Sequence, residues 1–142
     1  MVILKYKKQN QTKLKRTYMI SKEVTTSHLT LTDDGIFRVI LKEGSFETLQ
    51  TAEENGQALM ELKGDRPPLP ILIDFSLGAG QDQAARKYYA EQSRNWCSRA
   101  AILVGSPVSR VMGNIYMGLN KPNVPTKLFT DEQTALIWLK SN

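Results

Sequence analysis

Two short apolar runs, residues 71–73 and 100–104, stand out in the second half of the chain. The first run ends at Asp74 and Ser76, and a loop that contains two glycines, residues 77–81, follows it. Short continuous apolar runs between such breakers are typical of strands that are covered on both faces of a parallel or mixed sheet. We therefore predict that the two runs lie side by side inside a sheet that helices cover.

The first 41 residues instead show an alternation of apolar and polar positions. Around the polar segment 9–11, residues such as Leu4 and Leu14 fall on one parity and lysines fall mostly on the other. This pattern predicts a hairpin with one apolar and one cationic face. A second hairpin is predicted from strands 28–32 and 36–41, because Gly35 between them can supply the positive φ that a tight turn needs.

Helical spacing begins after the second hairpin. A first helix is predicted from Thr48 to Leu62, with Thr48 or Thr51 as its N-cap and Gly64 at its end. The segment Thr51-Ala52-Glu53-Glu54 fits a capping box. The expected apolar stripe consists of Leu49, Ala52, Leu59 and Leu62.

Three further helices follow from the same spacing. One begins at Asp82 as N-cap and runs toward Trp96, and a second opens with Ser106-Pro107. The last follows a short strand at 127–129 and has Thr130 or Asp131 as its cap, with an apolar stripe formed by Ala135, Leu136, Trp138 and Leu139. The order predicts an α/β fold: N-terminal antiparallel hairpins, then alternating helices and mostly parallel strands, with about four helices.

The length of 142 residues suits a single domain, which we divide into a basic N-terminal ribbon, residues 1–27, and a core, residues 28–142. Only a short apolar segment precedes the first lysine, so we expect neither a signal peptide nor a transmembrane segment. The single cysteine, Cys97, and the single histidine, His28, leave no basis for an internal disulfide or a zinc site. We therefore expect a cytoplasmic protein without a metal or cofactor.

The net charge of +5 is concentrated in the ribbon, which holds seven basic residues and one acidic residue. Such asymmetry is consistent with an acidic partner, whether protein, nucleic acid or membrane surface. Lysines on an edge ribbon also discourage edge-to-edge pairing of strands, and we favour this second interpretation. Nucleic acid is therefore not the partner that we expect.

Several segments of the later chain carry a family resemblance. They are Pro70-Ile71-Leu72-Ile73-Asp74, Ala85-Arg86-Lys87-Tyr88-Tyr89-Ala90, Ala100-Ala101-Ile102-Leu103-Val104, Ser109-Arg110-Val111-Met112-Gly113-Asn114 and Pro125-Thr126-Lys127-Leu128-Phe129. Together they resemble the small bacterial SpoIIAA-like proteins, often described as STAS or STAS/SEC14 domains and mostly uncharacterised. The likeness covers about residues 28–141. It implies a SpoIIAA-like α/β fold.

The founding members of that family are anti-sigma-factor antagonists that are switched by phosphorylation of a serine at a helix start. The corresponding loop here is Gly78-Ala79-Gly80-Gln81-Asp82, which has no hydroxyl at the helix start. Asp82 would place a fixed negative charge there, which the helix dipole stabilises by about 0.3–1 kcal/mol. We therefore do not expect the phospho-switch to be present.

The candidate binding residues lie where strands end and helices begin, since open α/β sheets place their sites at that edge. They are Asp74, Ser76, Gly78, Gly80, Asp82, Ser106, Ser109 and Arg110. The glycines do not complete a dinucleotide-binding fingerprint, and we interpret them as turn residues. The last three candidates could hold an anion at a helix start, although an ordinary N-cap is the simpler interpretation.

Aromatic and methionine residues at helical spacing allow two interpretations. They could line an apolar pocket between the sheet and the second and third helices, but such stripes more often form core. The residues are Tyr88, Tyr89, Trp96, Met112, Tyr116 and Met117.

The sequence shows no base, nucleophile and orienting group that would form a catalytic site. We therefore predict a non-enzymatic regulatory module that binds a protein partner, with a homodimer as one arrangement. The alternative is a carrier of a small apolar or lipid-like ligand at a membrane surface.

Overall fold

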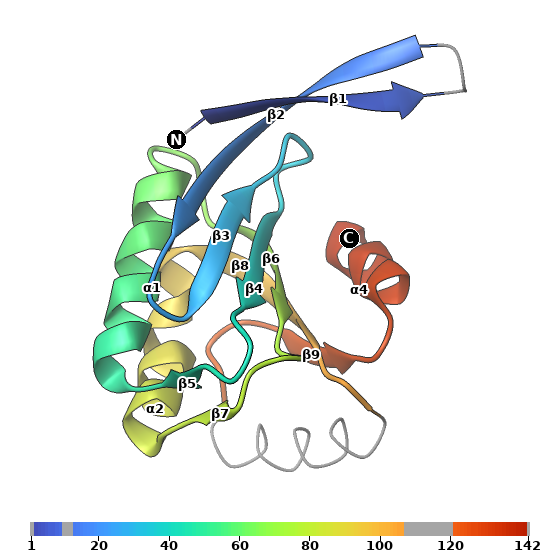
Figure 1. Ribbon diagram of the computed structural model, residues 1–142. Coiled ribbons are helices and arrows are strands. Elements are labelled where there is room, and N and C mark those ends of the chain that lie inside the picture. The colour runs from blue at the N-terminus through green and yellow to red at the C-terminus, as the bar shows by residue number, and fades with distance from the viewer. Residues whose placement is uncertain (1, 10–12, 107–120, 142) are drawn as a thin grey trace.

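The computed structural model describes residues 2–9, 13–106 and 121–141, with side chains from residue 19 onward (Figure 1). The strands are β1 (Val2–Gln9), β2 (Lys13–Glu23), β3 (Ser27–Leu31), β4 (Phe37–Leu41), β5 (Phe46–Glu47), β6 (Leu69–Asp74), β7 (Gly80–Gln81), β8 (Cys97–Leu103) and β9 (Thr126–Phe129). The helices are α1 (Leu49–Lys63), α2 (Gln83–Gln92), the short 3₁₀ helix η1 (Ser93–Asn95) and α4 (Glu132–Lys140).

Seven strands form one mixed sheet in the order β1-β2-β3-β4-β6-β8-β9. The first four strands are antiparallel to their neighbours, and β4, β6, β8 and β9 are parallel. Strand β6 lies inside this sheet and pairs with β8, so that Ile73 is opposite Ile102. The prediction that the two apolar runs lie side by side is therefore confirmed.

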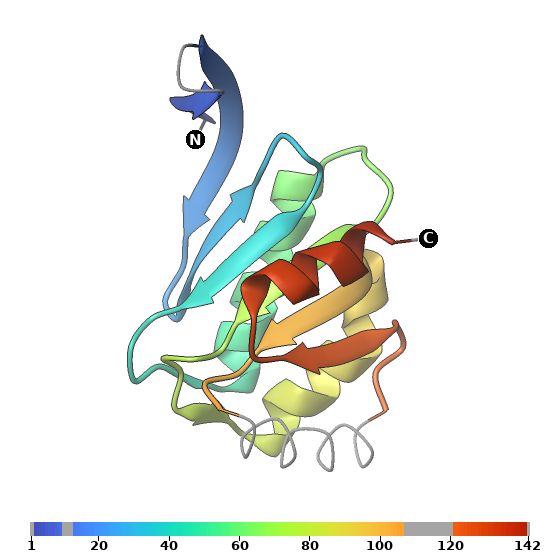
Figure 2. The same cartoon turned by 90° about the vertical axis from the view of Figure 1, so that its right-hand side faces the viewer.

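The helices cover both faces of the sheet, as the two views show (Figures 1 and 2). Ile71 packs in the cluster with α1 and α2, whereas its neighbour Leu72 packs in the cluster with α4. Because successive side chains of a strand point to opposite faces, a strand buried on both sides must be apolar at every position. This is why β6 reads as a continuous apolar run.

Both N-terminal hairpins are present. Gly35, with φ of 77°, sits in the turn between β3 and β4, as predicted. Only residues 20–23 of β2 pair with β3, so the earlier part of the β1–β2 ribbon extends past the main sheet (Figure 1). The structure describes the backbone of this ribbon but not the side chains before residue 19, so most of the predicted apolar and cationic faces lie outside the description.

The start and the buried face of α1 differ in detail from the prediction. Thr48 is the N-cap. Thr51 is the N3 residue of the capping box, whereas the prediction placed it at the N-cap of the box. Leu49 is 41 % exposed, so it does not belong to the buried stripe. Asn55 and Gly56 lie on the buried face instead, because α2 crosses α1 at that point.

The other helices agree with the prediction in part. Asp82 and Asp131 are the N-caps of α2 and α4. Helix α2 ends at Gln92, however, and Trp96 follows η1 rather than extending the helix. The helix expected after Ser106-Pro107 lies outside the described residues, which contain three α-helices.

We expect Gly56→Val to lower the free energy of unfolding by about 1–3 kcal/mol through overpacking. A Cβ at this position would overlap the Tyr88 hydroxyl and lie 3.0 Å from Cζ3 of Trp96, whose ring is buried. Urea unfolding at constant m-value measures the loss. Gln57→Val is the control, because it puts the same β-branched residue at an exposed position of α1; an equal loss in both variants would contradict the packing argument.

Candidate functional site

A second, two-stranded sheet joins the loop before α1 to the loop before α2. Strands β5 and β7 pair in parallel, with Phe46 opposite Gly80. Backbone hydrogen bonds extend this contact: the Gly44 amide donates to the Leu77 carbonyl at 2.8 Å, and the Ala79 amide donates to the Ser45 carbonyl at 2.8 Å. Two loops that are about 30 residues apart in the chain therefore form one rigid rim.

The two glycines of the predicted site have structural roles in this rim. Gly80 has φ of 135°, a backbone conformation that favours glycine. A Cβ on Gly78 would lie 2.8 Å from Cδ2 of Leu41. Gly78 therefore allows the loop after β6 to approach the end of β4, and Gly80 allows it to pair with β5.

Asp74, Ser76 and Asp82 form local hydrogen bonds at the same edge. Asp74 Oδ1 accepts from the Ser76 amide at 2.9 Å and from the Ser76 hydroxyl at 2.5 Å. Asp82 Oδ1 accepts from the Ala85 amide at 2.8 Å and so caps α2. The carboxyl groups are thus held in fixed positions at the carboxyl edge of the sheet.

Of the predicted anion site, the structure describes only Ser106. Ser106 lies just after β8, in a loop whose Gly105 approaches the Ser76 carbonyl. Ser109 and Arg110 lie outside the described residues. The structure therefore brings Asp74, Ser76 and the start of the Ser106 segment to one edge, as the sequence predicted for strand ends.

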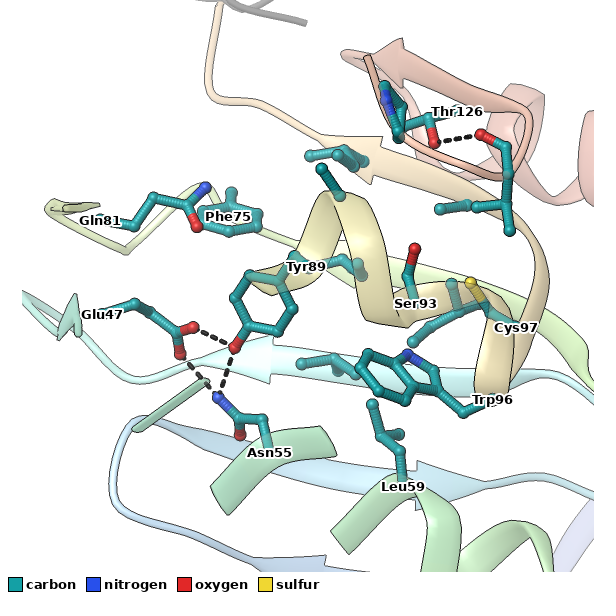
Figure 3. Close-up of a pocket in the computed structure, with 18 of the residues that line it drawn as sticks. Glu47, Asn55, Leu59, Phe75, Gln81, Tyr89, Ser93, Trp96, Cys97 and Thr126 are labelled. Carbon is teal, nitrogen blue, oxygen red and sulfur yellow. Dashed lines mark hydrogen bonds between the residues drawn. The ribbon is translucent and has the colours of Figure 1, made fainter. Parts of the chain in front are cut away.

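An apolar cavity of about 140 Å³ lies between the sheet and the helices α1 and α2 (Figure 3). Its walls are mainly apolar side chains from the sheet and both helices, including Val39, Leu59, Ile71, Ile73, Phe75 and Trp96. Tyr89 and Trp96, which the sequence singled out, line this cavity. Tyr88 instead stacks on Trp96, and Met112, Tyr116 and Met117 lie outside the described residues.

A buried carboxyl group closes one end of the cavity. Glu47 is 2 % exposed, and its Oε1 accepts from Asn55 Nδ2 at 2.7 Å and from Thr26 Oγ1 at 2.5 Å. Its Oε2 accepts from the Tyr89 hydroxyl, and Asn55 Nδ2 also lies 2.9 Å from that hydroxyl (Figure 3). Ser27 donates to Asn55 Oδ1 at 2.8 Å.

Sequence reasoning missed this polar network. Glu47, just before α1, and Asn55, in the middle of α1, have side chains that are usually exposed. The signal that could have found Asn55 is weak: it falls on the same helical face as Ala52 and Leu59. The full set of donors explains why the structure can bury a carboxyl group at all, since an unpaired one would be strongly unfavourable.

Two of the titratable side chains that line the cavity, Tyr89 and Cys97, stay protonated at neutral pH. Burial raises the pKa of the Tyr89 hydroxyl well above its ordinary value, and Glu47 next to it raises this pKa further. Burial also raises the pKa of the Cys97 thiol to about 12. A thiol in this state is a poor nucleophile, so the cavity wall offers no activated group there.

Among the residues that the structure describes, no three His, Cys, Asp or Glu side chains are grouped so that they could hold a metal ion. No helix in the described part of the chain is long and apolar enough to cross a membrane.

The rim also exposes apolar side chains, which we call the rim patch: Phe46, Leu49 and Leu77. They are 51 %, 41 % and 55 % exposed. Phe46 comes from β5, Leu49 from the first turn of α1, and Leu77 from the loop that is hydrogen-bonded to Gly44. Exposed apolar side chains that gather on one part of a folded domain commonly mark an interaction surface.

We expect Tyr89→Phe to lower the free energy of unfolding by about 1–3 kcal/mol, because it removes the donor to Oε2 of a buried carboxyl group. Tyr88→Phe is the matched control, since no hydrogen bond of its hydroxyl is seen among the described residues, and its loss should stay within about 0.5 kcal/mol. Chemical denaturation of both variants measures the difference. Equal stabilities would show that the network does not stabilise the fold.

We expect the Cys97 thiol to resist Ellman's reagent at pH 8 in the folded protein, because it is buried and its pKa is about 12. After unfolding in guanidinium chloride, one thiol per chain should react. Rapid stoichiometric reaction without denaturant would contradict the buried placement of Cys97.

Comparisons with known proteins place the chain in a family. A family model described as a domain of unknown function (DUF7793) matches residues 29–142. No curated protein matches the chain. A solved protein of unknown function from Arthrobacter sp. FB24 is 37 % identical, with a TM-score of 0.32, and the match covers 80 % of this chain and 99 % of that one.

Two further solved structures are similar at lower identity. An anti-sigma factor antagonist from Mycobacterium paratuberculosis is 19 % identical, with a TM-score of 0.50, over 88 % of this chain and 95 % of that one. An uncharacterised DUF3478 protein with a SpoIIAA-like fold, from Shewanella loihica PV-4, is 15 % identical, with a TM-score of 0.48, over 97 % and 93 %. At these identities the likeness concerns the fold alone. The fold is SpoIIAA-like, as the resemblance implied, and the chain belongs to the DUF7793 family.

Proposed function

We propose that this protein is a non-enzymatic regulatory module of the cytoplasm that binds a protein partner through the rim patch. The observation that carries the proposal is the exposure of Phe46 and Leu77 on two loops that backbone hydrogen bonds hold together. Exposed apolar side chains on a rigid support lose little conformational freedom on binding, which favours association. The fold shared with an anti-sigma factor antagonist supports a role of this kind.

The charges next to the patch indicate the chemistry of the partner. The two rim loops, residues 43–49 and 74–82, contain four acidic residues and no basic one. Three of these, Glu43, Asp74 and Asp82, are at least partly exposed, whereas Glu47 is buried. The complementary partner surface presents an apolar side chain flanked by lysine or arginine.

This module would work without the phospho-switch of the founding SpoIIAA-like proteins. The helix start that carries their serine carries Asp82 here, and its carboxyl group caps α2. A permanent charge at this position makes binding constitutive, since a phosphate of about −1.5 to −2 is neither added nor removed.

The alternative function, a carrier of a small apolar or lipid-like ligand at a membrane surface, is supported only by the apolar lining of the cavity. The cavity bounded by the described residues is about 140 Å³. That volume resembles an engineered cavity of about 150 Å³ that holds benzene.

We expect Phe46→Asp and Leu77→Asp each to abolish capture of the partner that the tagged wild-type protein recovers from its native cytosol. The centre of an interface tolerates an added carboxylate poorly, because the charge would be desolvated where the wild-type protein makes an apolar contact. Quantitative mass spectrometry of the captured proteins measures the loss.

Ile137→Asp is the matched control, because Ile137 is also apolar, is 65 % exposed and lies on α4, away from the rim. The partner should remain bound to this variant. Retention by all three variants, or recovery of no specific protein by the wild type, would contradict the proposal. A native mass of two chains that falls to one in Phe46→Asp would show that the rim binds a second copy instead of a different protein, and would overturn the assignment to a separate partner.

A further inference from the structure

The backbone register of the β1–β2 ribbon divides its residues between two faces. Residues directly opposite each other in an antiparallel pair share a face, and successive residues of a strand alternate between faces. The first face, which we call the apolar face, carries Val2, Leu4, Tyr6, Leu14, Tyr18 and Ile20. The second, which we call the lysine face, carries Lys5, Lys7, Lys13 and Lys15.

The apolar face continues the buried side of the sheet but extends beyond the helices. At its inner end, Ile20 packs against the core cluster that includes Leu59 of α1. Among the described strands, residues 13–19 of β2 pair with β1 alone. Both views place this part of the ribbon beyond the ends of the helices that the structure describes (Figures 1 and 2). A two-stranded ribbon without such cover is only marginally stable in water, so the apolar face calls for a partner.

The same part of the ribbon is strongly cationic. Residues 2–9 and 13–19 contain six basic residues and no acidic one. Lys7 lies directly opposite Lys15, and like charges in opposite positions are unfavourable. Protection of a sheet edge accounts for lysines on such a ribbon, but it does not account for the apolar face behind them. The partner therefore has to match both properties.

We propose that the ribbon docks the protein on a membrane surface that contains anionic lipids. Amphipathic helices bind in this way, with an apolar face at the boundary between headgroups and acyl chains and a polar face rich in lysine. Tyrosine is enriched at that boundary, and the register places Tyr6 and Tyr18 on the apolar face. The proposal concerns docking alone, and the rim patch lies at the opposite end of the molecule (Figure 1).

Basic residues on the apolar face are compatible with this position. Lys8 and Arg16 share that face near the tip of the ribbon. Long basic side chains can bury their apolar stems while the charge stays at the interface, where lipid phosphates lie. Each lysine or arginine near an anionic lipid surface adds to the attraction.

Two other partners match only one of the two properties. A second copy of the chain could cover the apolar face with its own, but the two ribbons would bring two sets of six basic residues together without a counter-charge. A nucleic acid duplex could receive the lysine face, since its major groove admits a two-stranded ribbon, but the apolar face would stay in water. An anionic lipid surface supplies both phosphate and an apolar layer.

The test is flotation of the full chain with lipid vesicles. We expect binding to vesicles of equal parts phosphatidylglycerol and phosphatidylcholine, and binding at least tenfold weaker to vesicles of phosphatidylcholine alone. Binding to the anionic vesicles should also weaken as sodium chloride is raised from about 0.1 M to about 1 M, because salt screens the attraction. These measurements need no variant.

A double variant, Lys7→Gln with Lys15→Gln, tests the lysine face. We expect it to bind the anionic vesicles about 25-fold more weakly, because each lysine at such a surface contributes about fivefold. Lys87→Gln with Lys121→Gln is the matched control, since it removes the same charge from exposed positions outside the ribbon. Its binding should stay within about twofold of the wild type.

Leu4→Asn tests the apolar face. It keeps the charge and nearly the size of the side chain, and we expect at least tenfold weaker binding because the burial of a leucine side chain is lost. Ile137→Asn is the control, since Ile137 is 65 % exposed on α4. Its binding should equal that of the wild type.

Several results would overturn the proposal. They include no binding of the wild type to anionic vesicles, equal binding to both kinds of vesicle, and equal losses in the two lysine double variants. Wild-type binding by Leu4→Asn, or displacement of the wild type from the vesicles by duplex DNA, would assign the lysine face to a soluble polyanion instead. A native mass of two chains without lipid that falls to one in Leu4→Asn would show that a second copy covers the apolar face.

Discussion

The Glu47 carboxyl group is the constraint on which this end of the molecule depends. Glu47 belongs to β5, and its carboxyl group is buried where three other elements meet this strand. Each of the three supplies one hydrogen-bond donor: Thr26 from the loop before β3, Asn55 from α1 and Tyr89 from α2. A buried carboxyl group is tolerated only when its oxygens are hydrogen-bonded. The four elements are therefore held in one relative arrangement.

The two residues of strand β5 face opposite sides, one toward the interior of the protein and one toward solvent. Glu47 points into the network and the cavity wall, whereas its neighbour Phe46 is half exposed on the rim. Successive residues of an extended strand face opposite sides, so a segment of two residues can serve both. The same holds for β7, where Gln81 lines the cavity and Gly80 lies under the Phe46 ring. The proposed docking surface and the wall of the cavity are thus the two sides of one small sheet.

In the proposed function, the rim is controlled differently from that of the founding SpoIIAA-like proteins, because Asp82 caps the helix start where those proteins are expected to carry a phosphorylatable serine. A carboxyl group that caps a helix is fixed in place and in charge. Any variation in the binding of a partner would have to come from other parts of the molecule, and the cavity behind β7 is adjacent to the rim.

Much of the architecture follows from local patterns. The continuous apolar run of β6 predicts a strand covered on both faces, and Asp82 and Asp131 identify the starts of α2 and α4 because their side chains can satisfy free backbone N–H groups. The α1 prediction was wrong at Leu49, which is exposed, since the helical spacing alone does not tell which apolar residue lies beyond the edge of the neighbouring element.

For the candidate site, the sequence predicted the edge of the sheet at which its residues lie, but not the contacts around them. Asp74, Ser76 and Asp82 lie at the carboxyl edge of the sheet, because the ends of parallel strands meet there. The pairing of β5 with β7 and the burial of Glu47 and Asn55 join segments that are far apart in the chain, and each segment is too short and too polar to show a period of its own.

The sequence by itself determined the order of the longer helices and strands among the described residues, the helix caps and the interior position of β6, because these depend on side chains that are neighbours along the chain. Only the tertiary structure decided which polar groups are buried, where a cavity remains and which apolar side chains stay exposed. These properties depend on contacts between distant segments, and the same Glu or Asn is stable in water or in the interior according to the donors that the fold brings to it.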